Sequence, residues 1–331
     1  MCKFIELKNN LGTEVTLCTM GASIYDIKTL DKNNELASIL ATPSKKVFPN
    51  ATSYFGKTIG RTGGRITNGK FTLDGVLYTI PSNDPNGLHG GIESLSYKNF
   101  DVNVFEDENG YIVDFSYFSP HLESGYPGNA KFNVIYTLFK NSNKLLVEYK
   151  AISDQKTLIN LSNHSYFNLS GNIKRDILEH ELYLNSSNFV MLDNMLPKEI
   201  VNASEIYSFK VPHRIGNYLF KDEIMELANG YDFPYVFDEV GYDYKNITLS
   251  DKESGRSLAI YTTYPAVVVY TCNYPEDVIV SNNKKLKEYD AVCLECSFIP
   301  NSINSDFIDD KKDILEANKL YNEKILYVFN E

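Results

Sequence analysis

Between positions 111 and 153 the sequence alternates apolar and polar residues, and this pattern constrains the fold more than any other feature. Alternate side chains share one face of an extended chain, and a period of two is typical of a β-strand. The region therefore predicts three strands. Their shared faces carry Tyr111, Val113, Phe115 and Tyr117, then Phe132, Val134, Tyr136 and Leu138, and then Leu145, Val147, Tyr149 and Ala151.

Shorter apolar runs broken by turn residues continue through the rest of the chain. They predict strands and hairpins up to about residue 40 and again at 182–184, 189–192, 257–264 and 267–271. An Asn-Gly pair at 68–69 and an Asp-Gly pair at 74–75 predict successive tight hairpins. Residues 221–228 favour a helix of about two turns. Residues 314–321 are compatible with a helix, but we predict a final strand, because one extended face would carry Tyr321, Ile325, Tyr327 and Phe329.

The length of 331 residues exceeds the roughly 200 to 250 residues that are common for one β domain, so length alone allows one domain or two. No linker rich in Ser, Gly or Pro and no repeat of fixed period marks a boundary. Many short strands with almost no helix are typical of a large antiparallel β-sandwich. We therefore predict an all-β fold in a single domain over residues 1–331.

Charge and composition bear on the class of partner. A net charge of −11 without a cluster of Lys or Arg argues against nucleic acid and anionic membranes, and it suits a neutral small molecule. The charged start, Met-Cys-Lys-Phe-Ile-Glu, does not look like a signal peptide, and no segment approaches the ~20 apolar residues of a membrane helix. Five scattered cysteines fit reduced thiols. We expect a cytoplasmic protein, and the sequence leaves its oligomeric state unknown.

The stretch at 160–171, Asn-Leu-Ser-Asn-His-Ser-Tyr-Phe-Asn-Leu-Ser-Gly, places one histidine among polar neighbours. In an extended chain Ser162, His164 and Tyr166 would share a wholly polar face that could line a cleft. A hydrogen-bonded histidine at a strand end is the structural alternative. Further candidate residues elsewhere in the chain favour the hypothesis that this face lines a cleft.

These further candidates lie in an apolar run and on tight turns. Glu295 stands among apolar residues, where a carboxylate is costly unless it has partners or a task. Arg61, Arg65 and His89 lie on glycine-rich turns, which let side chains approach a ligand closely. Asp232 follows a Gly-Tyr pair and could accept hydrogen bonds from sugar hydroxyls. The ordinary alternatives are a buried but satisfied Glu, a solvated or loop-bracing Arg and an Asp turn cap.

Two familiar motifs are rejected as sites. Residues 51–58, Ala-Thr-Ser-Tyr-Phe-Gly-Lys-Thr, match a relaxed phosphate-binding loop, but their interior is bulky and a glycine-rich turn follows where a helix should propagate. Cys293-Leu-Glu-Cys296 has the spacing of a zinc site, yet no second pair or histidine cluster accompanies it. In a strand its two sulfurs would also face opposite sides. We therefore predict neither a nucleotide site nor a metal site.

Six segments together closely resemble the aldose 1-epimerase (galactose mutarotase) family in their order and spacing. The segments are Gly-Arg-Thr-Gly-Gly-Arg-Ile at 60–66, Leu-His-Gly-Gly at 88–91, Gly-Tyr-Pro-Gly-Asn at 125–129, Asn-His-Ser-Tyr-Phe-Asn-Leu at 163–169, Gly-Tyr-Asp at 230–232 and Leu-Glu-Cys-Ser-Phe-Ile-Pro-Asn at 294–301. The resemblance implies a galactose mutarotase-like β-sandwich of antiparallel strands with an open sugar cleft. It also implies a general acid at His164, a general base at Glu295 and substrate-binding residues at Arg65, His89 and Asp232.

The chemistry of anomer exchange agrees with these residue types. The C1 hydroxyl must lose a proton while the ring oxygen gains one, so that the ring opens, the aldehyde end rotates and the ring closes on its other face. Burial raises the pKa of a carboxyl group and makes it a better base, whereas an imidazole with a reference pKa of ~6.5 can donate near neutrality. No cofactor, metal or covalent intermediate is required. Tyr166 is expected to help line the cleft.

Three departures from the family pattern bear on the substrate. Val268 stands where many members carry Gln, residues 92–97 lack the usual Phe or Trp, and Phe233 replaces a frequent His. A free aldohexose, galactose or glucose, is the expected substrate. One alternative is an epimerase of the same fold for another or a phosphorylated sugar, which would need extra Lys or Arg around the cleft. The other is a noncatalytic carbohydrate-binding protein, against which the retained acid/base pair argues.

Overall fold

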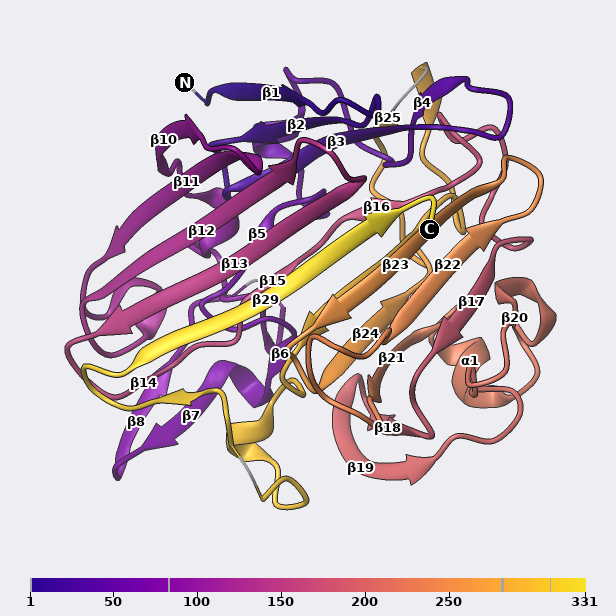
Figure 1. Ribbon diagram of the computed structural model, residues 1–331. Helices are drawn as coiled ribbons and strands as arrows, with labels where there is room; N and C mark the ends of the chain where they lie inside the picture. Colours follow the sequence, from indigo (N-terminus) through magenta and orange to yellow (C-terminus); the bar gives the residue numbers. More distant parts are fainter. Residues whose placement is uncertain (1, 83, 281–282, 310) are drawn as a thin grey trace.

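Figure 1 shows the computed structural model of the chain, which describes residues 2–82, 84–280, 283–309 and 311–331. Its largest sheet has nine strands, and every neighbouring pair is antiparallel. In spatial order these strands are β10 (Asp101–Glu106), β11 (Gly110–Ser119), β12 (Ala130–Phe139), β13 (Lys144–Ser153), β29 (Leu320–Phe329), β23 (Arg256–Thr262), β22 (Ile247–Asp251), β17 (Glu181–Leu184) and β20 (His213–Arg214).

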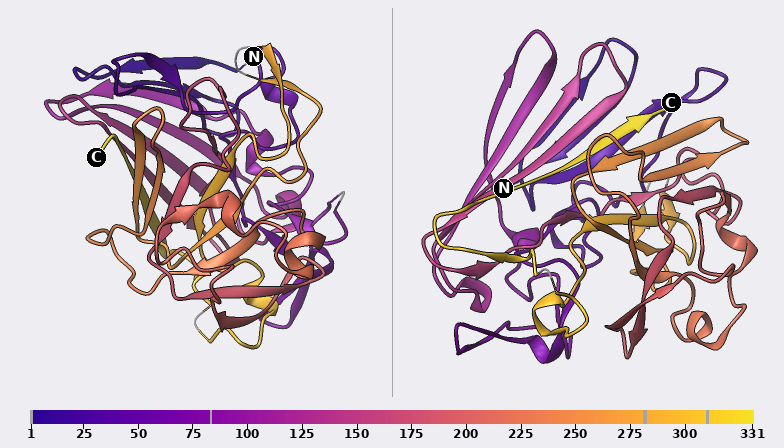
Figure 2. Two further views of the ribbon diagram at one scale, coloured as in Figure 1. Left: turned by 90° about the vertical axis from the view of Figure 1, so that its right-hand side faces the viewer. Right: turned by 60° about the horizontal axis from the view of Figure 1, so that its bottom comes forward.

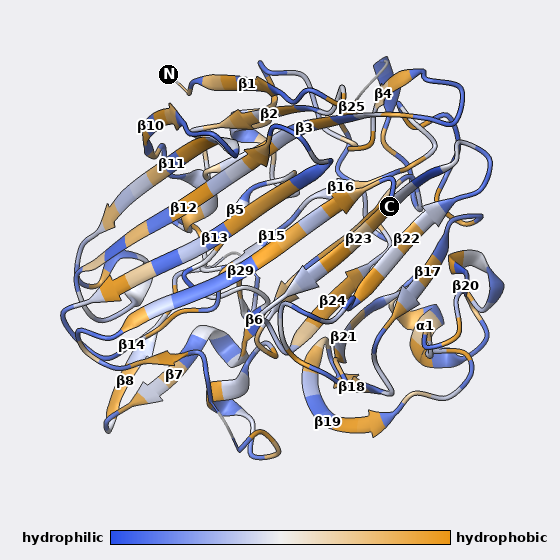
Figure 3. Cartoon of the chain, in the orientation of Figure 1, coloured by the Kyte–Doolittle hydropathy of each residue, from blue (hydrophilic) through white to orange (hydrophobic). Residues whose placement is uncertain are grey.

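The predicted alternation is confirmed in β11, β12 and β13, where alternate side chains face the protein core. Figure 3 shows the matching change between hydrophobic and hydrophilic residues along these strands. The predicted final strand is confirmed as β29. It lies in the interior of the nine-stranded sheet, between β13 and β23. The face that was predicted from its sequence is buried, because Tyr321, Ile325, Tyr327 and Phe329 all belong to the core.

A second, six-stranded antiparallel sheet packs against the first. Its strands in spatial order are β16 (Tyr166–Phe167), β27 (Val292–Ser297), β24 (Ala266–Tyr270), β21 (Asp232–Val236), β18 (Asn188–Asp193) and β19 (Leu196–Asn202). Side chains from the two sheets form one hydrophobic cluster, in which Val134 and Val147 of the first sheet join Val267 and Leu294 of the second. The two layers, visible in Figure 2, therefore form the predicted antiparallel β-sandwich.

Smaller sheets surround this sandwich. A four-stranded sheet is built from β1 (Phe4–Lys8), β2 (Glu14–Cys18), β3 (Ser23–Leu30) and β4 (Leu36–Ser38). The two-stranded pairs are β5 (Thr58–Ile59) with β15 (Ser162–Asn163), β6 (Arg65–Ile66) with β9 (Gly87–Leu88), β7 (Lys70–Leu73) with β8 (Val76–Thr79), β14 (Thr157–Leu158) with β28 (Ile314–Leu315), and β25 (Ile279–Val280) with β26 (Lys284–Lys285).

Helical structure is confined to short segments. The helix predicted at 221–228 is present as α1 (Glu223–Leu227), shorter than expected and capped by the Asp222 side chain. The 3₁₀ segments are Phe48–Asn50, Thr67–Gly69, Leu95–Tyr97, Glu123–Gly125, Ile215–Asn217 and Ser302–Asn304. No helix in the described ranges has the length and apolar character needed to cross a membrane.

One turn prediction is wrong in part. Residues 74–75 connect the hairpin β7–β8 as predicted. Residues 68–69 instead belong to a 3₁₀ turn between β6 and β7, which do not pair with each other, because β6 pairs with β9. The local turn signal was present, but a longer-range pairing decided which strand became the partner.

Candidate active site

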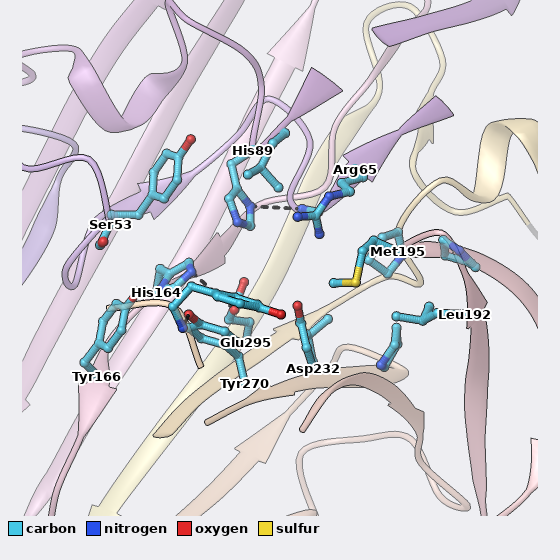
Figure 4. A pocket seen from close by; sticks show the side chains of 18 of the residues that line it. Ser53, Arg65, His89, His164, Tyr166, Leu192, Met195, Asp232, Tyr270 and Glu295 are labelled. Carbon is cyan, nitrogen blue, oxygen red and sulfur yellow. Dashed lines mark hydrogen bonds and ion pairs between the residues drawn. The ribbon is translucent and has the colours of Figure 1, made fainter. Parts of the chain in front are cut away.

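A cavity of about 270 Å³ lies over the six-stranded sheet, beside the loops that precede β5 and β6 and the end of β9. It is near the lower end of the roughly 300–1,000 Å³ that is usual for small-molecule sites. Figure 4 shows the side chains that converge on it. The structure brings together all six residues predicted for the site, which are Arg65, His89, His164, Tyr166, Asp232 and Glu295.

His164 is held by its own backbone. It lies between β15 and β16; its amide donates to the carbonyl of Lys57 at 3.1 Å, and its carbonyl accepts from the amide of Gly56 at 2.8 Å. The ring is stacked on Tyr166, with centroids 5.1 Å apart. The predicted polar face is wrong in one member, because Ser162 is fully buried and lies outside the cavity lining. The strand is interrupted at His164, so the simple alternation does not continue through it.

The asparagine side chains around His164 form hydrogen bonds with the backbone of neighbouring segments. Asn160 exchanges two hydrogen bonds with the backbone of Phe298, at 2.9 and 3.0 Å. Asn163 donates to the carbonyl of Gly56 at 2.9 Å, and Asn168 donates to two backbone carbonyls at 2.7 Å. Buried amides of this kind satisfy backbone groups that would otherwise lack a partner. These asparagine side chains therefore hold the backbone around His164 in place, and they do not line the cavity.

Glu295 projects from the middle of β27 into the cavity, and only 4% of its surface is exposed. Its Oε1 atom lies 3.4 Å from Nε2 of His164. Burial raises the pKa of the Glu295 carboxyl well above its ordinary value; the Asp232 carboxylate raises it further, and Arg65 opposes the rise. A carboxylate here is a strong base, because the cavity disfavours its charge.

Burial has the opposite effect on the neighbouring histidines. It lowers the pKa of His164 to about 4 and that of His89 well below its ordinary value. The pKa of His164 therefore lies below the reference value from which donation near neutrality was expected, because burial disfavours the imidazolium ion. These opposite shifts favour a neutral His164 beside a protonated Glu295, so the two residues form a pair that shares one proton.

The tautomer of His89 follows from a backbone contact. The amide of Gly64 donates to Nδ1 of His89 at 3.1 Å, so the neutral ring carries its proton on Nε2. Gly64 has a φ of +74°, and a Cβ atom there would come within 2.5 Å of Pro300 Cβ, so the close approach of this turn requires glycine. His89 thus offers the cavity a hydrogen-bond donor.

This tautomer also bears on metal binding. One ligand atom each from His89, His164 and Glu295 lie within 4.8 Å of one another, a spacing that can in principle hold an ion. A metal needs a lone pair from each ligand. Since Nδ1 of His89 already accepts a proton donor and Nε2 carries a hydrogen, the three residues do not fit a metal as they stand.

Arg65 and Asp232 complete the polar lining from opposite sides. Arg65, on β6, points toward the cavity, with Nε 3.7 Å from Asp84 Oδ2. Asp232 begins β21, and burial raises its pKa to about 6 although Arg65 opposes the rise. The second arginine of the same turn behaves differently. Arg61 is buried outside the cavity and donates to the carbonyls of Pro127 and Gly128 at 2.9 and 3.1 Å.

Sequence reasoning missed several residues of the lining. Tyr54 packs against both histidines, with ring centroids 4.7 Å from His89 and 5.8 Å from His164. The hairpin of β18 and β19 contributes Leu192, Met195 and Pro197, which are far in sequence from every predicted site residue. Tyr54 stands in the motif that was rejected as a phosphate loop, and the residues of the hairpin carry no signal beyond an ordinary strand pattern.

The two rejected motifs are structural. The 51–58 segment leads into β5 rather than a helix, and the Lys57 ammonium is buried and bonded to the carbonyl of Ala51. Cys293 and Cys296 face opposite sides of β27 and belong to different hydrophobic clusters. Neither segment has the geometry of the site that its spacing suggests.

A two-sheet antiparallel sandwich with a buried carboxylate–imidazole pair in a small cavity defines the galactose mutarotase-like class of proteins. Comparison with known proteins agrees: the aldose 1-epimerase family profile matches residues 3–328. The chain belongs to the aldose 1-epimerase family.

Individual relatives support this membership. The chain is 30% identical over 326 residues to a galactose mutarotase from Sus scrofa, covering 96% of this chain and 91% of that protein. It is 27% identical over 309 residues to an aldose 1-epimerase from Escherichia coli, covering 91% and 88%. The solved structure of a GalM/aldose epimerase homologue from C. elegans superposes with a TM-score of 0.89 at 27% identity and covers 99% of both chains.

Proposed function

We propose that the chain interconverts the α and β anomers of a free aldohexose, galactose or glucose, by acid/base-catalysed ring opening. The observation that carries the proposal is the 3.4 Å separation of Glu295 Oε1 and His164 Nε2, both of which are buried at the cavity. Proton removal from the C1 hydroxyl and proton delivery to the ring oxygen occur at two oxygens that are bonded to the same carbon, C1. A base and an acid in contact with each other can therefore serve both atoms.

In this mechanism Glu295 is the base and His164 is the acid. The pair starts with one proton between its two members, and a shift of that proton from the carboxyl to the imidazole creates the carboxylate and imidazolium that ring opening needs. The carboxylate then accepts the C1 hydroxyl proton while the imidazolium protonates the ring oxygen. After the C1–C2 bond rotates, reversal of both transfers closes the ring as the other anomer, and the pair regains its original state.

The other polar residues are assigned to substrate binding. The Nε2–H group of His89 can donate to a sugar oxygen, and the guanidinium group of Arg65 can donate several hydrogen bonds. Asp232 can accept from hydroxyl groups on the opposite side. Together these residues would hold the ring in one orientation relative to the acid/base pair, which is a large source of rate enhancement.

A phosphorylated sugar is the less favoured substrate. Among the described residues of the lining, Arg65 is the single lysine or arginine, and it already lies 3.7 Å from the Asp84 carboxylate. Phosphate sites usually gather several cationic donors. The low cation content therefore favours a neutral sugar.

Polarimetry of freshly dissolved α-D-galactose and α-D-glucose tests the proposal. The wild-type protein should accelerate the approach to the equilibrium rotation, and His164→Ala and Glu295→Ala should abolish the acceleration. His121→Ala is the matched control, because this histidine is exposed and does not line the cavity. No acceleration of either sugar by the wild type would contradict the proposal and leave a noncatalytic sugar-binding protein or another sugar as the reading of the site.

A further inference from the structure

Lys57 lies beside the candidate active site but outside its lining, in the motif that resembles a phosphate loop. Its side chain is completely buried, and the ammonium donates to the backbone carbonyls of Ala51 at 3.1 Å and Pro49 at 3.4 Å. The rings of Tyr97 and Phe48 lie 4.5 and 5.6 Å from the nitrogen. A buried cation is costly unless its hydrogen bonds and its surroundings compensate for lost water, so this lysine calls for an explanation.

The carbonyl groups that Lys57 binds belong to the loop at residues 49–54, which runs along the cavity. The same loop is held from its other side by Glu276, whose Oε2 atom accepts hydrogen bonds from the amides of Thr52 and Ser53, both at 2.9 Å. A cation on the carbonyls and an anion on the amides therefore fix this loop between them. The loop ends at Tyr54, a residue in the left-handed region with φ of +56°.

Tyr54 connects the loop, which Lys57 and Glu276 clamp from two sides, to the side chains of the cavity. Its ring packs edge-on against His89 at 4.7 Å and stacks on His164 at 5.8 Å. Lys57 connects the two parts directly, because its amide donates to the carbonyl of Tyr54 at 2.8 Å and its carbonyl accepts from the amide of His164 at 3.1 Å. One residue thus touches the backbone of the proposed acid and, through its side chain, the loop that covers the acid.

We propose that Lys57 is a positioning residue, which clamps the 49–54 loop so that Tyr54 stays packed against His164 and His89 and keeps water away from the His164 ring. Its effect on turnover rests on the proposed function, whereas its effect on the environment of His164 does not. Lys57 does not line the cavity, so it does not contact the substrate itself. Its ammonium group acts on the site through Tyr54.

An uncharged substitution distinguishes two roles of the Lys57 side chain, which are hydrogen bonding to the 49–54 loop and packing in the core. Lys57→Met keeps a long apolar stem but supplies no donor, so the carbonyls of Pro49 and Ala51 lose their partner. A looser loop would let water reach His164, and the pKa of the ring, now about 4, would rise toward its ordinary value. The titratable groups in contact with the ring are Tyr54, His89, Tyr166, Tyr270 and Glu295. None of these is changed by the substitution.

The charged surroundings of Lys57 permit a second, independent variant. Its titratable neighbours are Glu276, Cys18 and Cys2, and burial lowers the pKa of the amine to about 8. Glu276→Ala removes the anionic half of the clamp at a partly exposed position, where folding is not at risk. Lys45→Met is the matched control, because Lys45 also lies over aromatic rings but is half exposed and pairs with Glu6 outside the cavity.

NMR titration of the histidine rings between pH 4.5 and 8 provides the test, with the His164 signals assigned by their loss in His164→Gln. In the wild type and in Lys45→Met the His164 ring should stay mostly neutral across this range, because its pKa of about 4 lies below it. In Lys57→Met, and to a smaller extent in Glu276→Ala, it should titrate within the range, with a pKa at least one unit higher. An unchanged His164 in a folded Lys57→Met variant overturns the proposal; if that variant does not fold, an unchanged His164 in Glu276→Ala overturns it.

Turnover adds a second readout. Lys57→Met should lower kcat by about tenfold with less than a twofold change in KM, because the displaced Tyr54 disturbs the acid more than the sugar-binding groups. A merely stabilising lysine would lower Tm and leave both kcat and the His164 titration unchanged. If the wild type shows no mutarotation while the His164 shift still occurs in Lys57→Met, the proposed function fails and the clamp stands.

Discussion

The two walls of the cavity are held in different ways. One, the polar wall, consists of His164, Glu295, Asp232, Arg65 and His89. At its centre β27 is paired with β24 on one side and β16 on the other, and the backbone of His164 is bonded at both its amide and its carbonyl. The acid/base pair, Glu295 and His164, therefore lies on backbone that is hydrogen-bonded on both sides.

The other, the hairpin wall, consists of Leu192, Met195 and Pro197 on the β18–β19 hairpin. This hairpin forms the edge of the six-stranded sheet, and β18 pairs with β21 through only Asn188 and Phe189. The β18–β19 register shifts between Met191 and Leu192, beside the cavity. The hairpin wall is therefore attached at its base and free of the sheet at its tip (Figure 1).

This difference matches the demands of the reaction. Proton transfer needs donors and acceptors placed to within about 0.5 Å, which a rigid and doubly paired strand provides. Apolar contact with a sugar ring needs only area and approximate shape. The comparison predicts that substitutions in the polar wall change turnover greatly, and that substitutions in the hairpin wall change affinity modestly.

The largest effect is expected for Glu295→Gln, which keeps the shape of the side chain and removes its ability to accept a proton. Turnover should fall about 10³-fold, within the range that is usual for loss of a general base. Binding of galactose, measured by calorimetry, should change less than fivefold. Equal losses of binding and turnover would contradict the assignment of Glu295 as the base and would erase the distinction between the two walls.

Asp232→Asn is expected to raise KM by about 10-fold to 100-fold with a smaller change in kcat, because a carboxylate is the stronger acceptor for sugar hydroxyls. The wild type should also show a pH effect with a definite sign. Since the pKa of Asp232 is about 6, lowering the pH through 6 protonates this carboxyl and should raise KM. Initial-rate kinetics from pH 5 to 8 should show this rise in the wild type, and a flat KM in Asp232→Asn. The same rise in the variant would assign it to another group.

Val268 marks the border between the walls, since it pairs with Glu295 across β24 and β27 and lines the cavity. A sugar hydroxyl that faces its methyl groups has no partner there. Val268→Gln should therefore lower KM by about fivefold, the equivalent of the roughly 1 kcal/mol that one hydrogen bond contributes. Steady-state kinetics with galactose and glucose side by side measure the change. An increase in KM for both sugars would show that Val268 makes a favourable apolar contact.

The smallest effect is expected for Met195→Ala at the tip of the hairpin wall. Loss of part of one apolar contact should raise KM about twofold to threefold and leave kcat unchanged, because the tip is not coupled to the paired strands. The same steady-state assay measures it, with Leu192→Ala as a companion. A tenfold loss of kcat would mean that the hairpin positions the sugar as strictly as the polar wall does.

Sequence reasoning predicted the regular part of the fold well for a physical reason. Residues of β12 and β13 alternate between core and surface, so each position carries a binary signal that periodicity can detect. The same signal placed β29. It failed where tertiary pairing overrides local pattern, as at residues 68–69 and in the interrupted stretch around His164.

The site was predictable to the extent that its residues share motifs with a known family. The resemblance selected the residues that line the cavity, but it did not distinguish their neighbours. Arg61 and Arg65 stand four positions apart on one glycine-rich turn, yet one is enclosed by backbone carbonyls and the other faces the cavity. Tyr54 and Met195 were missed because only the folded chain brings them to the cavity.

The position of β29 in the middle of the nine-stranded sheet bears on how the chain folds. Its partners are β13, about 180 residues earlier, and β23, and the sheet consists of two separate halves until it arrives. Contacts this distant in sequence are slow to form, because the loop must close before any contact compensates for the lost chain entropy. During folding, β13 and β23 therefore each carry an exposed strand edge until β29 pairs with them. Unpaired edges of this kind favour aggregation, so the slow arrival of β29 is the step at which the chain is most exposed to it.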